Sequence, residues 1–548
     1  MSLGILAALC AVILYTLGRL CREAFTHYPH DALRGPQPQS FLRGNQKDFF
    51  HPQAWKRWAE WAATYGSAFI IRNILGARIV VLYDPKAIHA VMVKDQNIWT
   101  KGSGRSSTVF SVLLGPGLLS LRGGEQHRRQ RKMLNPVFSV AHLRNMTHIF
   151  YHVAHRVDKA IKARLPTTAP AQEVDINDWM SRATLEMLGQ AGLGYSFDDF
   201  AGDSADEYGE SIKLFFPHLA RTRVPAITVR QLSWLLSDSA IRTYFRTFPS
   251  ATVREVQRTS DTMATRSAAI VQQKKAALEK GDAALKHEVG EGKDIMSICL
   301  RANMATTPSE RLSDEELVAQ MSTFILAGMD TTANALSRIL WLLAAHPDVQ
   351  TRLRAELVEA QGGARARADV PYDDLVKLPY LDAVCRETLR VYAPVLFVSR
   401  AAAEDTVIPL SAPAPTRDGG AMSEIPVARG TTVLLLLQAS NVNPALWGAD
   451  AAEWRPERWL APLPAAVEDA RVPGVYAHLM TFAAGARACI GFKFSQLEMK
   501  VVLAVLLTSF SFELTDKEVR WNMSAVMYPS MEDSCKPGLL LRVKPLKE

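Results

Sequence analysis

The sequence lacks any pairing pattern among its cysteines. Its 548 residues contain six of them, with no CxxC pair and no regular spacing: Cys10, Cys21, Cys299, Cys385, Cys489 and Cys535. This scatter argues against both a disulfide framework and a zinc cage. It favours a protein of a reducing compartment.

The sequence also lacks low-complexity tracts and basic runs interleaved with aromatic residues. Hydrophobic residues make up 48% of the chain and charged residues 22%, so a large buried core is expected and disorder is not. The formal net charge of +8 and the pI near 9.1 favour an anionic surface or an acidic protein partner. We expect no nucleic-acid partner.

The N-terminus carries no charged residue over positions 3–18. This run is mostly apolar and lies at the lower length limit of a membrane-spanning helix, about 17 residues. A cleaved signal peptide is the alternative, but no basic region precedes the run and no small-x-small site follows it. Because Arg19 and Arg22 come after the run, the positive-inside rule places everything downstream in the cytoplasm. We therefore expect a single-pass anchor in the endoplasmic reticulum membrane.

A proline-containing segment separates this run from the rest of the chain. Gly35 is followed by Pro36, Gln37 and Pro38, which favours a stiff, non-helical spacer. We predict an anchor over residues 1–22, a hinge over 23–45 and a catalytic domain over 46–548.

The remaining chain is predicted to be mainly helical with a small β portion. Helical periodicity is found around residues 126–165, 174–194, 252–280, 314–346, 348–361, 374–392 and 489–508. Strand-like runs are fewer, at 68–74, 78–83 and 431–438. Surface loops are expected at 279–293, 362–369 and 411–430. None of these loops separates independent domains and no repeat is present, so we predict one large α-rich domain.

Residues 482–491 contain a cysteine directly before a predicted helix. At a helix N-terminus, unpaired backbone N–H groups and the helix dipole stabilise an anionic sulfur, as a metal-binding thiolate at Cys489 requires. Gly485 and Gly491 would let the backbone approach a flat macrocycle, and Arg487 could bind a propionate. Taken alone, a cysteine before a helix is more often a small core residue.

The whole pattern, from Phe482 to Gly491, resembles the haem-binding loop FxxGxRxCxG of the cytochrome P450 family. This resemblance implies a single large cytochrome P450 fold and a haem b whose iron Cys489 binds as an axial thiolate. Such ligation is held to favour cleavage of the O–O bond. Phe482, Gly485, Arg487 and Gly491 would then belong to the cofactor site.

Polar residues interrupt the long apolar helix predicted over 314–346. Gly328 in mid-helix, followed by Asp330 and two threonines, is locally unfavourable. One explanation is a kinked core helix whose hydroxyls bond back to carbonyls; the other is an acid and an alcohol beside bound O2. The segment resembles the family's AGxDTT motif, which assigns the acid to Asp330 and the proton-delivering alcohol to Thr331.

Three further charged positions resemble structural elements of the family. Glu387 and Arg390 match ExxR, and Arg458 lies in a PERx element. A Glu/Arg pair at this spacing is usually a solvated surface pair. By the resemblance, the three would instead form a buried ion network that supports the haem loop, and the loss of one partner would cost haem.

Other basic residues are candidates for binding the propionates. His127 and Arg131 resemble the family's WxxxR element with His in place of Trp, which retains a ring N–H donor, and Arg400 is a third candidate. The neighbouring Arg128, Arg129 and Lys132 are expected to be exposed, where they could present a positive face to an acidic reductase.

The resemblance covers nearly the whole chain and implies a monooxygenase of the fungal microsomal type. Such an enzyme inserts one atom of O2 into a hydrophobic small molecule, commonly a terpenoid or related compound of secondary metabolism. Because the chain has no Rossmann fingerprint, its electrons would come from a separate NADPH–cytochrome P450 reductase. Apolar residues expected to line the substrate pocket are Val109, Phe110, Leu113, Phe215, Phe216 and residues 395–398.

Two alternatives stay open at this point. One is a haem-thiolate isomerase or dehydratase that needs no external electrons; the Asp330/Thr331 pair counts against it. The other is a non-catalytic, membrane-anchored haem or sterol binder, which would not need a thiolate ligand.

Overall fold

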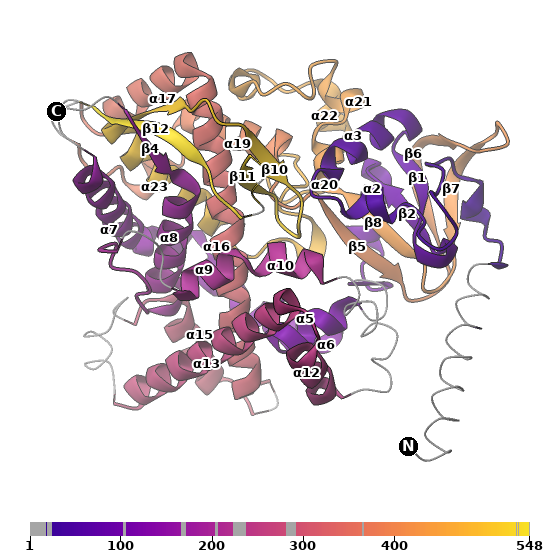
Figure 1. The fold of residues 1–548 in the computed structure, drawn as a ribbon, viewed down its shortest axis with the longest axis horizontal. Coiled ribbons are helices and arrows are strands. Elements are labelled where there is room, and N and C mark those ends of the chain that lie inside the picture. Colours follow the sequence, from indigo (N-terminus) through magenta and orange to yellow (C-terminus); the bar gives the residue numbers. More distant parts are fainter. Residues whose placement is uncertain are drawn as a thin grey trace.

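Helices form most of the protein and small sheets the rest, as Figure 1 shows. The computed structural model describes residues 18, 25–101, 106–165, 171–202, 207–222, 237–280, 292–308, 310–363, 367–532, 534 and 536–546. In these ranges the predicted fold class, mainly α with a small β portion, is confirmed.

The helices of the N-terminal half are α2 (Gln46–Phe50), α3 (Ala54–Tyr65), α4 (Pro85–His89), α5 (Ser106–Leu114), α6 (Gly124–Leu134), α7 (Val140–Arg164), α8 (Ile176–Met187), α9 (Glu207–Lys213), α10 (Phe215–Arg221), α12 (Asp238–Thr247) and α13 (Ala251–Glu279). Those of the C-terminal half are α15 (Ile295–Ala305), α16 (Asp314–Ala345), α17 (Pro347–Ala360), α18 (Tyr372–Leu375), α19 (Pro379–Val391), α20 (Leu437–Asn441), α21 (Pro444–Trp447), α22 (Ala465–Ala470) and α23 (Phe492–Ser509). Short turns of other helical types include η3 (Ala90–Lys94), η4 (Asn135–Phe138), η5 (Leu188–Leu193), η6 (Pro456–Leu460) and η7 (Gly485–Arg487).

Helix α16 crosses the helical part of the molecule (Figure 1) and packs against α8, α13 and α23. It begins at a capping box, in which the Ser313 hydroxyl accepts from Glu316 N–H and the Glu316 carboxylate accepts from Ser313 N–H. Most of its residues are buried on all sides. An apolar helix of this kind is stable only in the centre of a core.

The largest sheet has the strand order β1-β2-β8-β5-β3, and only β2 and β8 are parallel neighbours. The strands are β1 (Ala68–Arg72), β2 (Arg78–Leu82), β3 (Trp99–Lys101), β4 (Gln172–Asp175), β5 (Phe397–Ala402), β6 (Thr406–Pro415), β7 (Ala421–Val427), β8 (Thr432–Leu436), β9 (Phe510–Leu514), β10 (Val519–Asn522), β11 (Tyr528–Met531) and β12 (Leu540–Pro545). The order β4-β12-β9 forms a second sheet, and β10–β11 and β6–β7 are two-stranded. Pairing of β3 with β5 brings together residues that lie 299 to 303 positions apart in the chain.

Two local predictions were wrong. The loop expected over 411–430 is mostly the β6–β7 hairpin, because a two-stranded ribbon has free edges and can accept Pro413 and Pro415. The helical stretch expected over 126–165 is two helices, α6 and α7. Pro136 lies in the turn η4 between them, where its ring interrupts the α-helical hydrogen bonding.

The N-terminal anchor is also corrected. In the part of the chain that the structure describes, no helix is both long and apolar enough to span a bilayer, so the single-pass anchor and the endoplasmic reticulum location predicted from it are not supported. The run over 3–18 lies outside the described residues except for Gly18. The predicted limits of the hinge and the catalytic domain stay a prediction.

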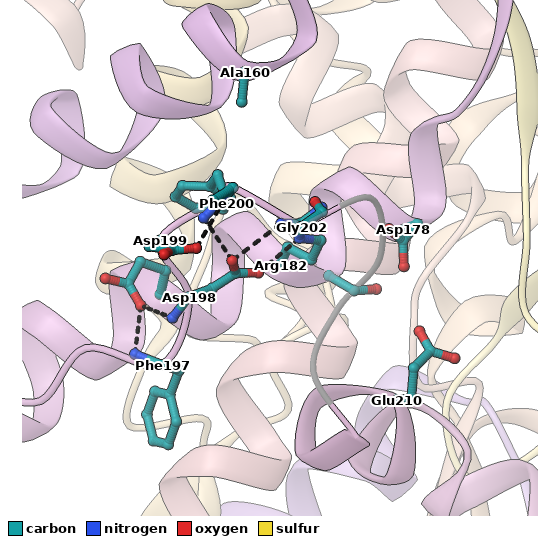
Figure 2. Close-up of polar contacts among 12 residues, drawn as sticks. Ala160, Asp178, Arg182, Phe197, Asp198, Asp199, Phe200, Gly202 and Glu210 are labelled. Atoms are coloured by element: carbon teal, nitrogen blue, oxygen red, sulfur yellow. Dashed lines mark hydrogen bonds and ion pairs between the residues drawn. The ribbon is translucent and has the colours of Figure 1, made fainter. Parts of the chain in front are cut away.

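Polar contacts hold residues 197–202 beside α8. Figure 2 shows Arg182 beside Asp198; its Nε and Nη2 donate to that carboxylate over 2.6 and 3.0 Å. Glu186, which is buried, accepts from the backbone N–H groups of Phe197 and Asp198 over 2.6 and 2.8 Å. These contacts pin the segment to α8.

Candidate functional site

Cys489 lies two residues before the N-cap of α23. Its backbone N–H donates to Phe482 O over 2.8 Å, which closes the loop. Burial raises the pKa of the Cys489 thiol, while a hydrogen bond from Gly491 N–H and the charge of Arg131 lower it. The N-cap of α23 thus supplies one backbone donor to the sulfur, and α6 supplies a nearby cation; both favour a thiolate.

Cys489 and the middle of α16 both keep accessible surface. Cys489 lies deep enough in the protein for burial to raise its pKa, yet its side chain keeps accessible surface, whereas Ala488 before it is buried. In the middle of α16, Ala327 is exposed and Thr331 partly so, between stretches of fully buried residues. Both elements therefore face space that the protein's own side chains do not fill.

The backbone and the packing of the loop require a glycine at position 485 but not at position 491. Gly485 has φ +66°, and a Cβ there would lie 1.9 Å from Met92 O in η3. Gly485 is thus required by backbone conformation and by close packing. Gly491 has φ −88° and a Cβ on it would meet only Phe138, at 3.9 Å, so protein packing imposes no such requirement.

A cluster of cations lies near this loop. Arg487 donates to Leu121 O over 3.0 Å, and Arg400 donates to Ser399 O over 2.9 Å. Burial lowers the pKa of each to about 10. Lys101 on β3 donates to Leu119 O, and burial together with the charges of Arg487 and Arg400 lowers its pKa to about 7.

His127 and Arg131 on α6 complete the cluster. Burial and then the charges of Arg487, Arg131, Lys101 and Arg400 lower the pKa of His127 to about 4, so its ring is neutral near pH 7. Arg131 is held by the protein itself, since it donates to Ala488 O over 2.6 Å and to Asn135 Oδ1 over 2.8 Å.

These cations are not neutralised within the described residues. Lys101, Arg131, Arg400 and Arg487 form no ion pair with any described carboxylate. Since like charges in a buried cluster repel one another, the arrangement favours a bound dianion. The cations could bind two propionates, and the accessible cysteine could bind an iron, so the residues present suit a haem. Lys101 was missed from the sequence because only the β3–β5 pairing brings it to Arg400.

Glu387, Arg390 and Arg458 meet in a buried network. Arg390 donates to both carboxylate oxygens of Glu387 over 2.8 and 2.7 Å, and Arg458 approaches the same carboxylate at 3.4 Å. Trp459 Nε1 donates to it over 2.9 Å. Glu387 and Arg390 have no exposed surface.

Asn441 connects this network to the cysteine loop. Its carbonyl accepts from Arg390 over 3.2 Å, and its side chain accepts from Met480 N–H over 2.6 Å and donates to Thr481 over 2.7 Å. Residues 480 and 481 directly precede Phe482. No sequence pattern identified Asn441, because the residues it contacts lie 51 positions before it and 39 to 40 positions after it.

Asp330 and Thr331 point in different directions from α16. Thr331 is partly accessible, and its hydroxyl donates to Ala327 O over 2.7 Å. Asp330 is buried and accepts from Asn334 Nδ2 over 3.0 Å. Burial raises the pKa of Asp330 to about 7, against the lowering effects of Asn334 and of the charge of Lys213.

Lys213 on α9 links Asp330 electrostatically to two further carboxylates. Its ammonium lies 3.1 Å from Asp178 and 3.5 Å from Glu210. Figure 2 shows these two carboxylates turned toward each other. Lys213 and Asp178 are largely buried, whereas Glu210 is 42% exposed, so charged groups extend from Asp330 toward solvent. Sequence reasoning missed Lys213.

The basic residues proposed for a reductase face are paired in the structure. Arg128 contacts Glu125 at 2.7 Å, Arg129 contacts Glu316 at 2.7 Å, and Lys132 lies 3.5 Å from Glu310. Residues Arg128 and Lys132 are well exposed, but their carboxylate partners reduce the positive field they present.

The predicted substrate-lining residues divide into two groups. Residues 395–398 and Phe110 are half-buried, and Lys101 lies 5.6 Å from the Phe110 ring. Val109, Leu113, Phe215 and Phe216 are buried in the core.

An enzyme that binds haem through a cysteine needs an accessible sulfur for the iron and uncompensated cations for the propionates. The fold and the site place this protein in the class of haem-thiolate enzymes. The family model for cytochrome P450 matches residues 34–534, and the chain belongs to this family. It is 54% identical to the ganoderic acid synthetase of Ganoderma lucidum, with 94% of each chain covered. It is 47% identical to cytochrome P450 monooxygenase 91 of Postia placenta, covering 98% of this chain and 97% of the relative. A P450 monooxygenase of Hericium erinaceus is 34% identical over 96% of this chain and 95% of its own length.

The chain is accordingly a haem monooxygenase of secondary metabolism. The family's cofactor is a haem iron with a thiolate ligand, and its monooxygenases use O2, a hydrophobic substrate and a redox-partner reductase. The predictions of family, enzyme class and general function are confirmed.

Proposed function

We propose that Cys489 is the axial ligand of a haem b. The observation that carries this assignment is the accessible surface of the Cys489 side chain, together with the Gly491 N–H and the charge of Arg131 at its thiol. The other described cysteines, Cys299 and Cys385, are buried, and burial raises the pKa of each thiol to about 12. When bound, the haem supplies the activation of O2 and the insertion of one oxygen atom into a C–H bond.

The propionates would be held by Arg400, Arg487, His127 and Lys101. The two guanidinium groups keep N–H donors in addition to those used on backbone carbonyls, and His127 offers a neutral ring N–H. Arg131 has a different role in this proposal: it fixes the Ala488 carbonyl and places a positive charge near the sulfur.

Asp330 and Thr331 would deliver protons to the oxygen site. With a pKa near 7, Asp330 can both hold and release a proton at neutral pH, which suits a relay. Thr331 is the member of the pair with accessible surface, and Asp330 is the one connected through Lys213 toward solvent. Protons would pass from the Glu210 side to Asp330 and be presented at the Thr331 hydroxyl.

The substrate would be a terpenoid or a related apolar molecule, and electrons would come from a separate NADPH–cytochrome P450 reductase. Support for the substrate class comes from the relative named ganoderic acid synthetase. The half-buried residues 395–398 are the described positions best placed to contact it.

The test is reconstitution of the full chain with haem, NADPH, the reductase and a panel of triterpenes, sesquiterpenes and fatty acids under ¹⁸O2. We expect NADPH-dependent products that carry one heavy oxygen atom. A haem-thiolate isomerase or dehydratase would instead convert hydroperoxides without NADPH, and that result would overturn the proposal.

A further inference from the structure

Arg338 is a buried cation in the C-terminal half of α16. It is 6% exposed. Its guanidinium carbon lies 3.3 Å from the ring centre of Trp521 on β10 and 4.2 Å from that of Tyr392, which follows α19. Aromatic rings therefore cover faces of the guanidinium.

Arg338 has no polar partner in the part of the chain that the structure describes: no hydrogen bond and no ion pair reaches it. Two other buried arginines differ in this respect, because Arg182 and Arg390 are each paired with a carboxylate through two N–H donors. Burial lowers the pKa of Arg338 well below its ordinary value. Leaving a buried charge unpaired is costly, and such a site gains most from an anionic ligand.

The side chain lines a cavity of ≈ 20 Å³ whose walls include Asn334, Tyr392, Leu396 and Trp521 and no acidic residue. A water occupies about 10–15 Å³ by this measure, so one or two groups the size of a carboxylate oxygen fit. The indole N–H of Trp521 also has no acceptor. Because rings stack on the guanidinium faces, its N–H donors, which lie in the guanidinium plane, stay free for a ligand.

The cavity adjoins the proposed oxygen site and the predicted substrate wall. Asn334, one of its lining residues, donates to Asp330 over 3.0 Å. Leu396 belongs to the half-buried segment 395–398. Arg338 follows Asp330 by two turns of α16, which corresponds to about 12 Å along the helix.

We propose that Arg338 binds a carboxylate of an apolar substrate and so places a carbon about 12 Å away at the oxygen site. This inference rests on the proposed monooxygenase function and narrows its substrate to apolar molecules that carry an acid group. Trp521 contributes its face and its free N–H, and Tyr392 fixes the guanidinium orientation. Arg338 is a specificity-determining residue, and the hydrocarbon body of the substrate lies along residues 395–398.

Dodecanoic acid and dodecan-1-ol are the probes for a binding test on the haem-loaded full chain. They share an apolar tail and differ in charge. Calorimetric titration at neutral pH is expected to show the acid binding about tenfold or more tightly than the alcohol, as a charged hydrogen-bonded pair in a closed site allows. Arg338→Met should remove this preference and leave alcohol binding within about twofold. Arg338→Lys should keep part of it.

Trp521→Phe is the matched variant, since it keeps the aromatic face and deletes only the N–H. It should weaken acid binding by a few fold and leave alcohol binding unchanged. If wild-type protein binds neither probe, binds both alike, or keeps its acid preference in Arg338→Met, the inference is wrong. It is equally wrong if acetate alone competes as strongly as dodecanoate, because the site would then serve a free anion.

The carbon monoxide difference spectrum of the same samples separates this inference from the function on which it rests. A wild-type sample without a thiolate signature would refute the proposed function. A normal thiolate spectrum without an Arg338-dependent acid preference would refute the carboxylate site alone.

Discussion

Replacing Glu387 by Gln tests the buried ion network most sharply. The wild-type carboxylate accepts from Arg390, Arg458, Trp459 and the Arg455 N–H, all over 2.7 to 3.4 Å. Gln has nearly the same shape, but it carries no charge and turns an N–H2 group toward one set of donors. Two buried guanidinium groups would then lose their shared counter-charge.

The expected loss is about 3–5 kcal/mol, the usual cost of stranding a buried charge. Against a total stability of about 5–15 kcal/mol this is a large fraction. Asp450→Asn is the control, because Asp450 also contacts Arg458, at 2.9 Å, but is 28% exposed. Its loss should cost about 1 kcal/mol or less.

The assay is haem content after purification, followed by the rate of haem loss on warming. Because Arg390 also holds Asn441, which holds residues 480 and 481, Glu387→Gln should release haem quickly or fail to load it. Asp450→Asn should resemble wild type. Equal haem retention in the two variants would refute the view that this network supports the cysteine loop.

Three further variants give independent tests. Burial raises the pKa of Asp330 to about 7. The free energy of unfolding of the wild type, relative to Asp330→Asn, should therefore fall by about 1.4 kcal/mol per pH unit from about pH 4 to about pH 7 and stay constant above that. Urea unfolding at several pH values measures this difference, and a pH-independent difference would contradict the prediction. Gly485→Ala forces a Cβ to 1.9 Å from Met92 O at φ +66°, so the yield of haem-loaded protein should collapse; a normal yield would show that the loop can adjust. Lys101→Met should speed haem transfer to a scavenger protein several-fold, and an unchanged rate would remove Lys101 from the cofactor site.

The sequence predicted best where the signal is local. Long apolar periodicity located α13, α16 and α17 within a few residues, because a buried helix needs apolar residues on every turn. The contiguous pattern over 482–491 was enough to find the cysteine loop. By contrast, Pro413 and Pro415 predicted a loop where the structure has the β6–β7 ribbon. A strand can contain proline where its edge is unpaired, and the sequence does not show which strand edges are unpaired.

Residues whose role depends on distant partners were out of reach. In the sequence, Lys101 is only the last residue of a short strand, and its role appears when β3 pairs with β5. Lys213 is likewise an ordinary helical lysine in the sequence, and its role appears when α9 packs on α8. Arg338 occupies a position of α16 at which the periodicity predicts a buried residue, but the periodicity does not indicate which side chains surround it. Long-range packing determines which of these charges meet, and no spacing rule contains that information.

The spectrum of the reduced protein under carbon monoxide tests the central claim most directly. We predict the red-shifted Soret band of a thiolate adduct for the wild type and for Cys299→Ala and Cys385→Ala, and its loss in Cys489→Ser. A Cys489→Ser protein that keeps the band, or a wild-type protein that never shows it, would contradict the assignment of Cys489 as the haem ligand.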